Sequence, residues 1–149
     1  MRTSLVAALG VSVVVALGGA LGALGRWGVS LALPHAPGAW PWATVTVNLT
    51  GCLVIGALLA VLMARWPGHP WLRPFLATGV LGGYTTFSAF AVDAVQLVEA
   101  GRVAAASGYV LVSVVGGLGA VVLGLVTGRV AVGAHDPVRA ELEAGEDRS

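Results

Sequence analysis

The stretch GVLGGYTTFSAF, residues 79–90, decides how this chain folds, because it interrupts an apolar segment with residues that a helix does not favour. It contains three glycines, two threonines, a serine and two phenylalanines. Gly82 and Gly83 weaken a helix, and the neighbouring Thr85 and Thr86 do not restore its propensity. We therefore expect a break in the helix at this point.

The segments around this stretch are typical of a membrane protein. Of 149 residues, 57% are hydrophobic and only 10% are charged, whereas soluble domains have roughly 25% charged residues. Four apolar runs reach the length of about 20 residues that a membrane helix needs: 5–33, 42–64, 71–99 and 103–130. We predict an all-α integral membrane domain of four transmembrane helices over residues 1–131. The polar tail, residues 132–149, is expected to be disordered.

The charged residues are few and evenly spread. The net charge is +1 and all eight basic residues are arginine, so the chain has no dense basic patch for nucleic acid. With four spans, Arg2, Arg65, Arg73 and Arg129 fall on one side of the membrane, and Arg26 and Arg102 on the other. This weak imbalance gives the chain little preference for one orientation.

Small residues recur at four-residue spacing in two of the spans. Such residues let membrane helices approach closely. The first span has Gly18 and Gly22, and the fourth has the series Gly116, Ala120, Gly124 and Gly128. Because four helices make a thin bundle, we expect these seams to support an oligomer, most simply a dimer.

Polar side chains inside a bilayer need a partner or a cavity. Thr44 and Asn48 share one face of the second span, and Tyr109 and Ser113 share one face of the fourth. A single hydroxyl can bond back to a carbonyl of its own helix. The Asn48 amide has two donors and an acceptor, so it requires a polar partner.

A break in the third span would release backbone carbonyls, which a membrane tolerates only where they meet protein, water or an ion. Freed carbonyls are good ligands for a hard cation. After the break, Phe87 and Phe90 are three residues apart and share a face. Spacing alone favours two packing residues, but the hydroxyls of Thr86 and Ser88 beside them favour a functional role.

Three blocks together identify a resemblance. GGALGALGRW (18–27), TVTVNLTG (44–51) and GVLGGYTTFSAF (79–90) followed by Asp93 resemble the signature blocks of the Fluc/CrcB fluoride channels. Tyr109 and Ser113 extend the match into the fourth span. The third block is the most specific of the three.

The resemblance implies a fold and a function. It implies an antiparallel dual-topology dimer of four-helix subunits, with two pores along the subunit interface. A homodimer is expected, and a heterodimer with a paralogous subunit is the alternative. The implied function is passive export of fluoride through a channel in the lipid of the cell inner membrane, which protects the cytoplasm. No enzymatic activity is expected.

The resemblance also implies site residues. Phe87, Phe90 and Asn48 correspond to the pore residues, and the implied hydroxyl track comprises Thr86, Ser88 and Ser113, with Tyr109 nearby. Arg26 corresponds to an arginine near the vestibule. A structural sodium ion is implied at the dimer centre, held by the backbone carbonyls of Gly82 and Thr85.

The chemistry of these groups suits a small anion. Fluoride accepts hydrogen bonds and donates none, so a pore must replace its water with amide and hydroxyl donors. The edges of aromatic rings are electropositive and can also face an anion. Several weak neutral donors release an ion more readily than a buried arginine would.

The chain departs from the family pattern at several positions. Ala89 and Gly117 stand where family members often or sometimes carry a hydroxyl residue. Trp27, Tyr84 and Asp93 replace a tyrosine, a smaller apolar residue and a glutamate respectively. The hydroxyl track is therefore shorter than in some members.

Two other classes of protein compete with a channel. A small multidrug-type, proton-coupled exporter also has four helices, but it needs a carboxylate in the membrane, and the first span has none. A membrane enzyme would need histidine, cysteine or paired acids converging in the bilayer. His35, His69 and His135 fall in the expected connections and tail.

Overall fold

A computed structural model describes the backbone of residues 2–133 and the side chains of residues 9–133. These residues form helices and connecting turns: α1 (Arg2–Ala32), α2 (Trp42–Arg65), the π-helix η1 (Pro74–Leu81), α3 (Gly82–Tyr84), α4 (Phe87–Glu99) and α5 (Val103–Gly133). Within this part of the chain, four segments are long and apolar enough to cross a membrane: Leu9–Ala32, Trp42–Arg65, Pro74–Glu99 and Val103–Gly133. The predicted all-α membrane domain with four spans is confirmed. Of the predicted tail, residues 132 and 133 belong to α5, and the rest lies outside the described residues.

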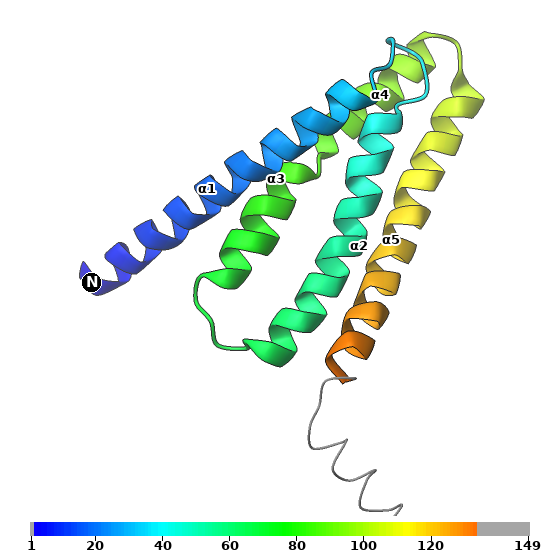
Figure 1. Cartoon of the computed structure of the whole chain (residues 1–149). Coiled ribbons are helices and arrows are strands. Elements are labelled where there is room, and N and C mark those ends of the chain that lie inside the picture. The colour runs from blue at the N-terminus through cyan, green and yellow to red at the C-terminus, as the bar shows by residue number, and fades with distance from the viewer. Residues whose placement is uncertain (1, 134–149) are drawn as a thin grey trace, which may run out of the picture.

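The helices form two packed pairs (Figure 1). The long helices α2 and α5 lie side by side, and α1 packs against η1 and α3. The α1–α2 and α4–α5 connections lie at one end of the molecule, and the α2–η1 connection lies at the other. Arg102 joins the first two connections, because its Nη1 donates a hydrogen bond of 2.8 Å to the carbonyl of Gly38. The chain therefore crosses the bundle four times.

Both seams of small residues are used inside this one subunit. A Cβ atom at Gly22 would collide with the carbonyl of Val80 in η1, and one at Gly124 would collide with the carbonyl of Leu53 in α2. The same holds for Gly18 against η1 and Gly128 against α2. The expectation that these seams join subunits is wrong, because each already allows close approach of two backbones within the subunit. The dimer itself stays a prediction.

The third span is broken, as predicted, but the break lies just after the glycine pair. Gly82–Tyr84 stays helical, and the chain becomes extended at Thr85 (ψ 162°) and Thr86 (φ −150°, ψ 126°) before α4 begins. Thr86 caps α4, because its side chain accepts a hydrogen bond of 3.1 Å from the backbone N–H of Ala89. Capping by Thr86 therefore fixes where the second half of the span begins.

Gly83 has a packing role that its helix propensity does not reveal. A Cβ atom there would collide with the backbone of Gly19, so the glycine lets α3 approach α1. The π-helix before it, η1, was not predicted from sequence. Gly82 and Gly83 therefore belong to a helical segment that packs against α1, and the break occurs after them, at Thr85 and Thr86.

Candidate functional site

Asn48 holds the broken segment of the third span through two hydrogen bonds. Its Nδ2 donates to the carbonyl of Thr86 at 2.9 Å, and the N–H of Thr86 donates to its Oδ1 at 2.8 Å. The predicted polar partner of Asn48 is therefore the backbone of a single residue at the break, Thr86. The amide pairs the N–H of Thr86, which has no helical acceptor there, and adds a bond to its carbonyl, which as the N-cap carbonyl also begins the hydrogen bonds of α4.

These bonds and the α4 cap divert two backbone donors. In a continuous α-helix, the N–H of Thr86 would donate to the carbonyl of Gly82, and the N–H of Ala89 would donate to that of Thr85. Instead, the first donates to Asn48 Oδ1 and the second to Thr86 Oγ1. Both carbonyls predicted as sodium ligands have thus lost their ordinary helical donors. Carbonyl oxygens suit a hard cation. The described residues contain no group of three or more His, Cys, Asp or Glu side chains that could hold a metal, so these backbone oxygens are the candidate ligands.

A central cavity of about 410 Å³ lies beside the break, between α2, η1, α4 and α5. Its wall includes most of the predicted site: Asn48, Gly82, Thr85, Thr86, Phe87, Phe90 and Ser113. Sequence reasoning did not place Gly51, Cys52, Ile55, Ala77, Leu81 and Val114 on this wall. None of these lining residues is charged. The cavity is therefore an uncharged space with amide, hydroxyl and aromatic groups on its wall.

The hydroxyls around the cavity differ in how they are bonded. Thr85 Oγ1 donates back to the carbonyl of Leu81 at 2.8 Å, the ordinary helical arrangement. Thr86 Oγ1 lies 3.2 Å from Ser88 Oγ. Ser113 Oγ is buried and has no hydrogen-bond partner among the described residues. Buried hydroxyls usually have a partner, so Ser113 is a donor available to something that occupies the cavity.

The two phenylalanines lie together on the cavity wall. Their ring centroids are 5.8 Å apart with planes tilted by 44°. Phe90 also packs against Tyr109, with centroids 5.2 Å apart, whereas Phe87 is 80% exposed in the subunit. The tilted rings can direct electropositive edges toward one point.

A second cavity of about 530 Å³, which we name the entrance cavity, lies between α1, α2 and α4. Arg26, Ser88 and Asp93 line it, and Thr86 lines both cavities. The structure thus places Arg26 and Ser88 away from the central cavity, on the far side of Thr86. Thr86 is the residue that the two linings have in common.

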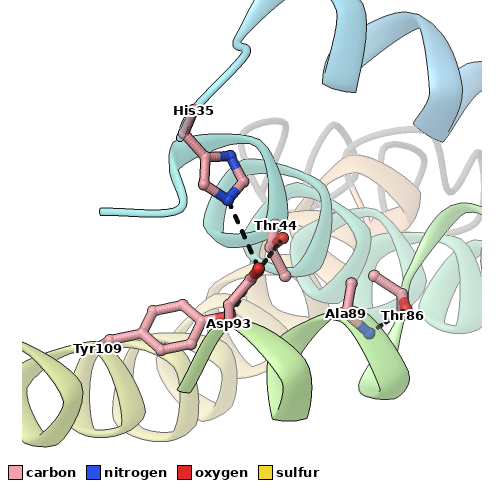
Figure 2. A network of polar contacts seen from close by, with 6 residues as sticks. All are labelled: His35, Thr44, Thr86, Ala89, Asp93 and Tyr109. Atoms are coloured by element: carbon pink, nitrogen blue, oxygen red, sulfur yellow. Dashed lines mark hydrogen bonds and ion pairs between the residues drawn. The ribbon is translucent and has the colours of Figure 1, made fainter. Parts of the chain in front are cut away.

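Tyr109 lies outside both cavities, in a polar cluster around Asp93 (Figure 2). Its side chain is fully buried, and its hydroxyl donates to Asp93 Oδ2 at 3.5 Å. Thr44 Oγ1 donates to the same oxygen at 2.6 Å, and His35 Nε2 lies 3.5 Å from Asp93 Oδ1. A role of Tyr109 in the pore stays a prediction. Its ring packs against Phe90 and does not line either cavity.

Sequence reasoning missed this cluster. The available signal was weak: Asp93 follows the third signature block, and Thr44 lies one helical turn before Asn48. His35 gave no signal, because it lies in a proline-rich connection whose position depends on tertiary packing.

Comparison with known proteins matches most of the chain. Residues 13–125 match the family model described as CrcB-like protein, Camphor Resistance (CrcB). A protein of Paracoccus denitrificans named fluoride-specific ion channel FluC is 52% identical over 115 residues, which cover 77% of this chain and 91% of that protein. A FluC protein of Rhodospirillum centenum is 46% identical over 119 residues, covering 79% and 94% respectively. FluC 2 of Nocardia farcinica is 46% identical over 120 residues, covering 80% and 86%.

Replacing Asn48 by alanine should destabilise the subunit. The change leaves the N–H of Thr86 without a partner, at about 1–3 kcal/mol, and removes one of the bonds to its carbonyl. We expect a clearly lower midpoint of thermal unfolding for the purified protein in detergent. Thr127→Val is the matched control, because Thr127 bonds only to carbonyls of its own helix and is exposed. Equal midpoints for the two variants would contradict the bracing role of Asn48.

Proposed function

The chain belongs to the CrcB family, and we propose that it is a fluoride-specific ion channel through which fluoride leaves the cytoplasm. Its curated relatives are named as fluoride-specific ion channels. Its four apolar spans make it a multi-pass membrane protein. We place it in the cell inner membrane, where a passive channel would lower the fluoride concentration inside the cell. It is a channel and not an enzyme.

The observation that carries this function is the uncharged, donor-bearing wall of the central cavity. Ser113 offers a hydroxyl without a partner, and Asn48 Nδ2 has a second N–H beyond the one given to Thr86. Fluoride accepts hydrogen bonds and donates none, so such groups can replace part of its water. Because no lining residue is cationic, the ion is not trapped by a fixed opposite charge.

Phe87 and Phe90 contribute to the same task. An aromatic ring is electropositive at its edge and electronegative at its face. The tilted pair on the cavity wall can therefore present edges to an anion and exclude bulk water. Phe90 is held by Tyr109 behind it, which gives the buried tyrosine an indirect role in placing the ring.

The entrance cavity supplies an approach to this site. Arg26 on its wall attracts anions, and Ser88 with Thr86 offers hydroxyls on the way to the central cavity. We propose a path from the entrance cavity past Thr86 to Asn48, Ser113 and the two phenylalanines.

The alternative, a proton-coupled drug exporter, finds no support in the geometry. Such an exporter needs a carboxylate that faces its substrate cavity and exchanges protons. The central cavity has none among its lining residues. Asp93, on the entrance cavity, is engaged by Thr44, Tyr109 and His35.

We propose that two copies of the chain form the working channel. Phe87 lines the central cavity and yet is 80% exposed, so one wall of the cavity is open in the single subunit. An ion beside Phe87 would there face lipid, which cannot solvate it. A second subunit covering this side would close the path. The even spread of arginines suits an antiparallel homodimer, and a paralogous partner is the alternative.

The fit of a sodium ion rests on the freed carbonyls of Gly82 and Thr85. Both residues line the central cavity, and both have lost their helical donors. We propose that these carbonyls hold a structural sodium between the subunits. The ion would supply a fixed positive charge where the backbone presents unpaired oxygens.

The function predicts selective fluoride flux. Purified protein in liposomes loaded with potassium fluoride should release the anion when a potassium ionophore is added. Liposomes loaded with potassium chloride should retain theirs, because chloride is larger and binds donors more weakly. Electrodes selective for each ion give the measurement. Equal release of both ions would contradict the function.

Replacing Phe87 or Phe90 by isoleucine should reduce fluoride flux. Each change keeps an apolar side chain but removes a ring edge worth about 0.5–1.5 kcal/mol, or roughly threefold to tenfold in rate. The eluted particle should keep the size of the parent protein. Leu31→Ile, at an exposed position outside both cavities, is the control. Unchanged flux in both phenylalanine variants would remove the aromatic role.

The dimer and the sodium ion can be tested together. Light scattering after gel filtration in sodium buffer should give twice the mass of the subunit. Exchanging sodium for a large organic cation should lower thermal stability and fluoride flux, because the carbonyls of Gly82 and Thr85 lose the ion that they bind. A subunit mass in sodium would contradict the dimer. Unchanged stability and flux without sodium would contradict the ion site.

A further inference from the structure

His35 lies beside Asp93, which lines the entrance cavity (Figure 2). Its Nε2 is 3.5 Å from Asp93 Oδ1, and the two side chains are 24% and 11% exposed. Asp93 itself lines the cavity that also contains Arg26. A histidine thus contacts the acidic group that an anion would meet on the proposed path.

The connection that carries His35 is tied down. Pro34 and Pro37 flank the histidine and restrict the backbone around it. The next residue after Pro37, Gly38, accepts a hydrogen bond from Arg102 Nη1 at 2.8 Å. The imidazole is therefore held beside Asp93 by the fold and does not hang on a free loop.

The carboxylate of Asp93 is arranged to receive this partner. Thr44 and Tyr109 both donate to Oδ2, at 2.6 and 3.5 Å, whereas His35 approaches Oδ1. Both hydroxyls thus use the same carboxylate oxygen as their acceptor. Oδ1 faces His35, so the charge of the imidazole acts directly on that of the carboxylate.

Charge on this cavity wall depends on His35. Arg26 and Asp93 are of opposite sign and cancel. Histidine ordinarily changes charge between about pH 5 and pH 8. A neutral His35 leaves the group of three with no net charge, and a protonated His35 gives it one positive charge.

The neighbouring titratable groups do not take over this role. Arg102 lies on the adjoining connection and keeps its charge over this range. The Tyr109 hydroxyl donates to Asp93. Glu99 lines a separate groove between α4 and α5. Helix α2 contributes the neutral Thr44 to the cluster.

We propose that His35 sets the charge of the entrance cavity and so makes fluoride conduction depend on pH. As pH falls, the imidazolium offsets the negative charge of Asp93, and the cavity attracts anions more strongly. As pH rises, the imidazole becomes neutral, the group of three carries no net charge, and the cavity attracts fluoride less strongly. The inference rests on the proposed ion path through this cavity, and it adds a regulatory residue to it.

The test is the pH profile of fluoride release from liposomes, with the same pH on both sides and protein-free vesicles subtracted. Between about pH 8 and about pH 6, flux through the parent protein should rise roughly twofold to tenfold, the low range of electrostatic effects on ion approach. His35→Gln should flatten the profile near the high-pH flux. His35→Arg should flatten it near the low-pH flux. His69→Gln, in the connection at the other end of the molecule, should keep the parent profile.

The results distinguish a failure of the role of His35 from a failure of the proposed channel function. A rise of equal size in His35→Gln and in the parent protein would overturn the role of His35 and leave the channel intact. So would a His35→Arg profile that still follows pH. Absence of fluoride flux in the parent protein at every pH would overturn the proposed function, and this inference with it.

Discussion

The rest of the structure depends on satisfying the backbone of one residue, Thr86, in the middle of the membrane. Extended backbone at Thr85 and Thr86 would leave polar groups unpaired in lipid, which is costly. Asn48 reduces that cost by bonding both the N–H and the carbonyl of Thr86. Because Asn48 belongs to α2, which packs along α5, the position of the break is fixed by the pair of long helices. The central cavity lies beside the contact between Asn48 and Thr86, so this contact also determines where the hydrogen-bond donors and aromatic rings of its wall lie.

The contact between Asn48 and Thr86 depends on helices whose backbones approach one another closely. Gly22 and Gly124 let α1 meet η1 and α5 meet α2 where a side chain would hold them apart. In lipid such contacts replace the hydrophobic effect as the force between helices. The exposed aliphatic residues on the outer faces, such as Leu118 and Val130, are suited to acyl chains. Small residues thus lie between the helices and many large apolar residues face the lipid, whereas in a soluble bundle the large apolar residues lie between the helices.

The sequence predicted the spans and the break, and seven of the residues implied by the family resemblance lie on the wall of the central cavity. Length and hydropathy suffice for the spans, and Asn48 in an apolar run required a polar partner. The sequence did not reveal that this partner is the Thr86 backbone, because nothing in it states which helices adjoin. The sequence did not reveal that the glycine pair stays helical and that the chain becomes extended only at Thr85 and Thr86, since propensity describes isolated helices and says nothing of the contact between Gly83 and Gly19. The His35–Asp93 contact depends on how a connection folds over the bundle, which periodicity cannot describe.

Thr86 combines several tasks in one residue. Its N–H and carbonyl bind Asn48, its hydroxyl caps α4 and lies near Ser88, and its side chain borders both cavities. Valine would keep the shape and lose the cap, whereas larger polar residues would narrow both spaces at once. Serine alone among the common residues retains the hydroxyl at similar size. One side chain at this position therefore determines both where α4 begins and how wide the two cavities are beside the break.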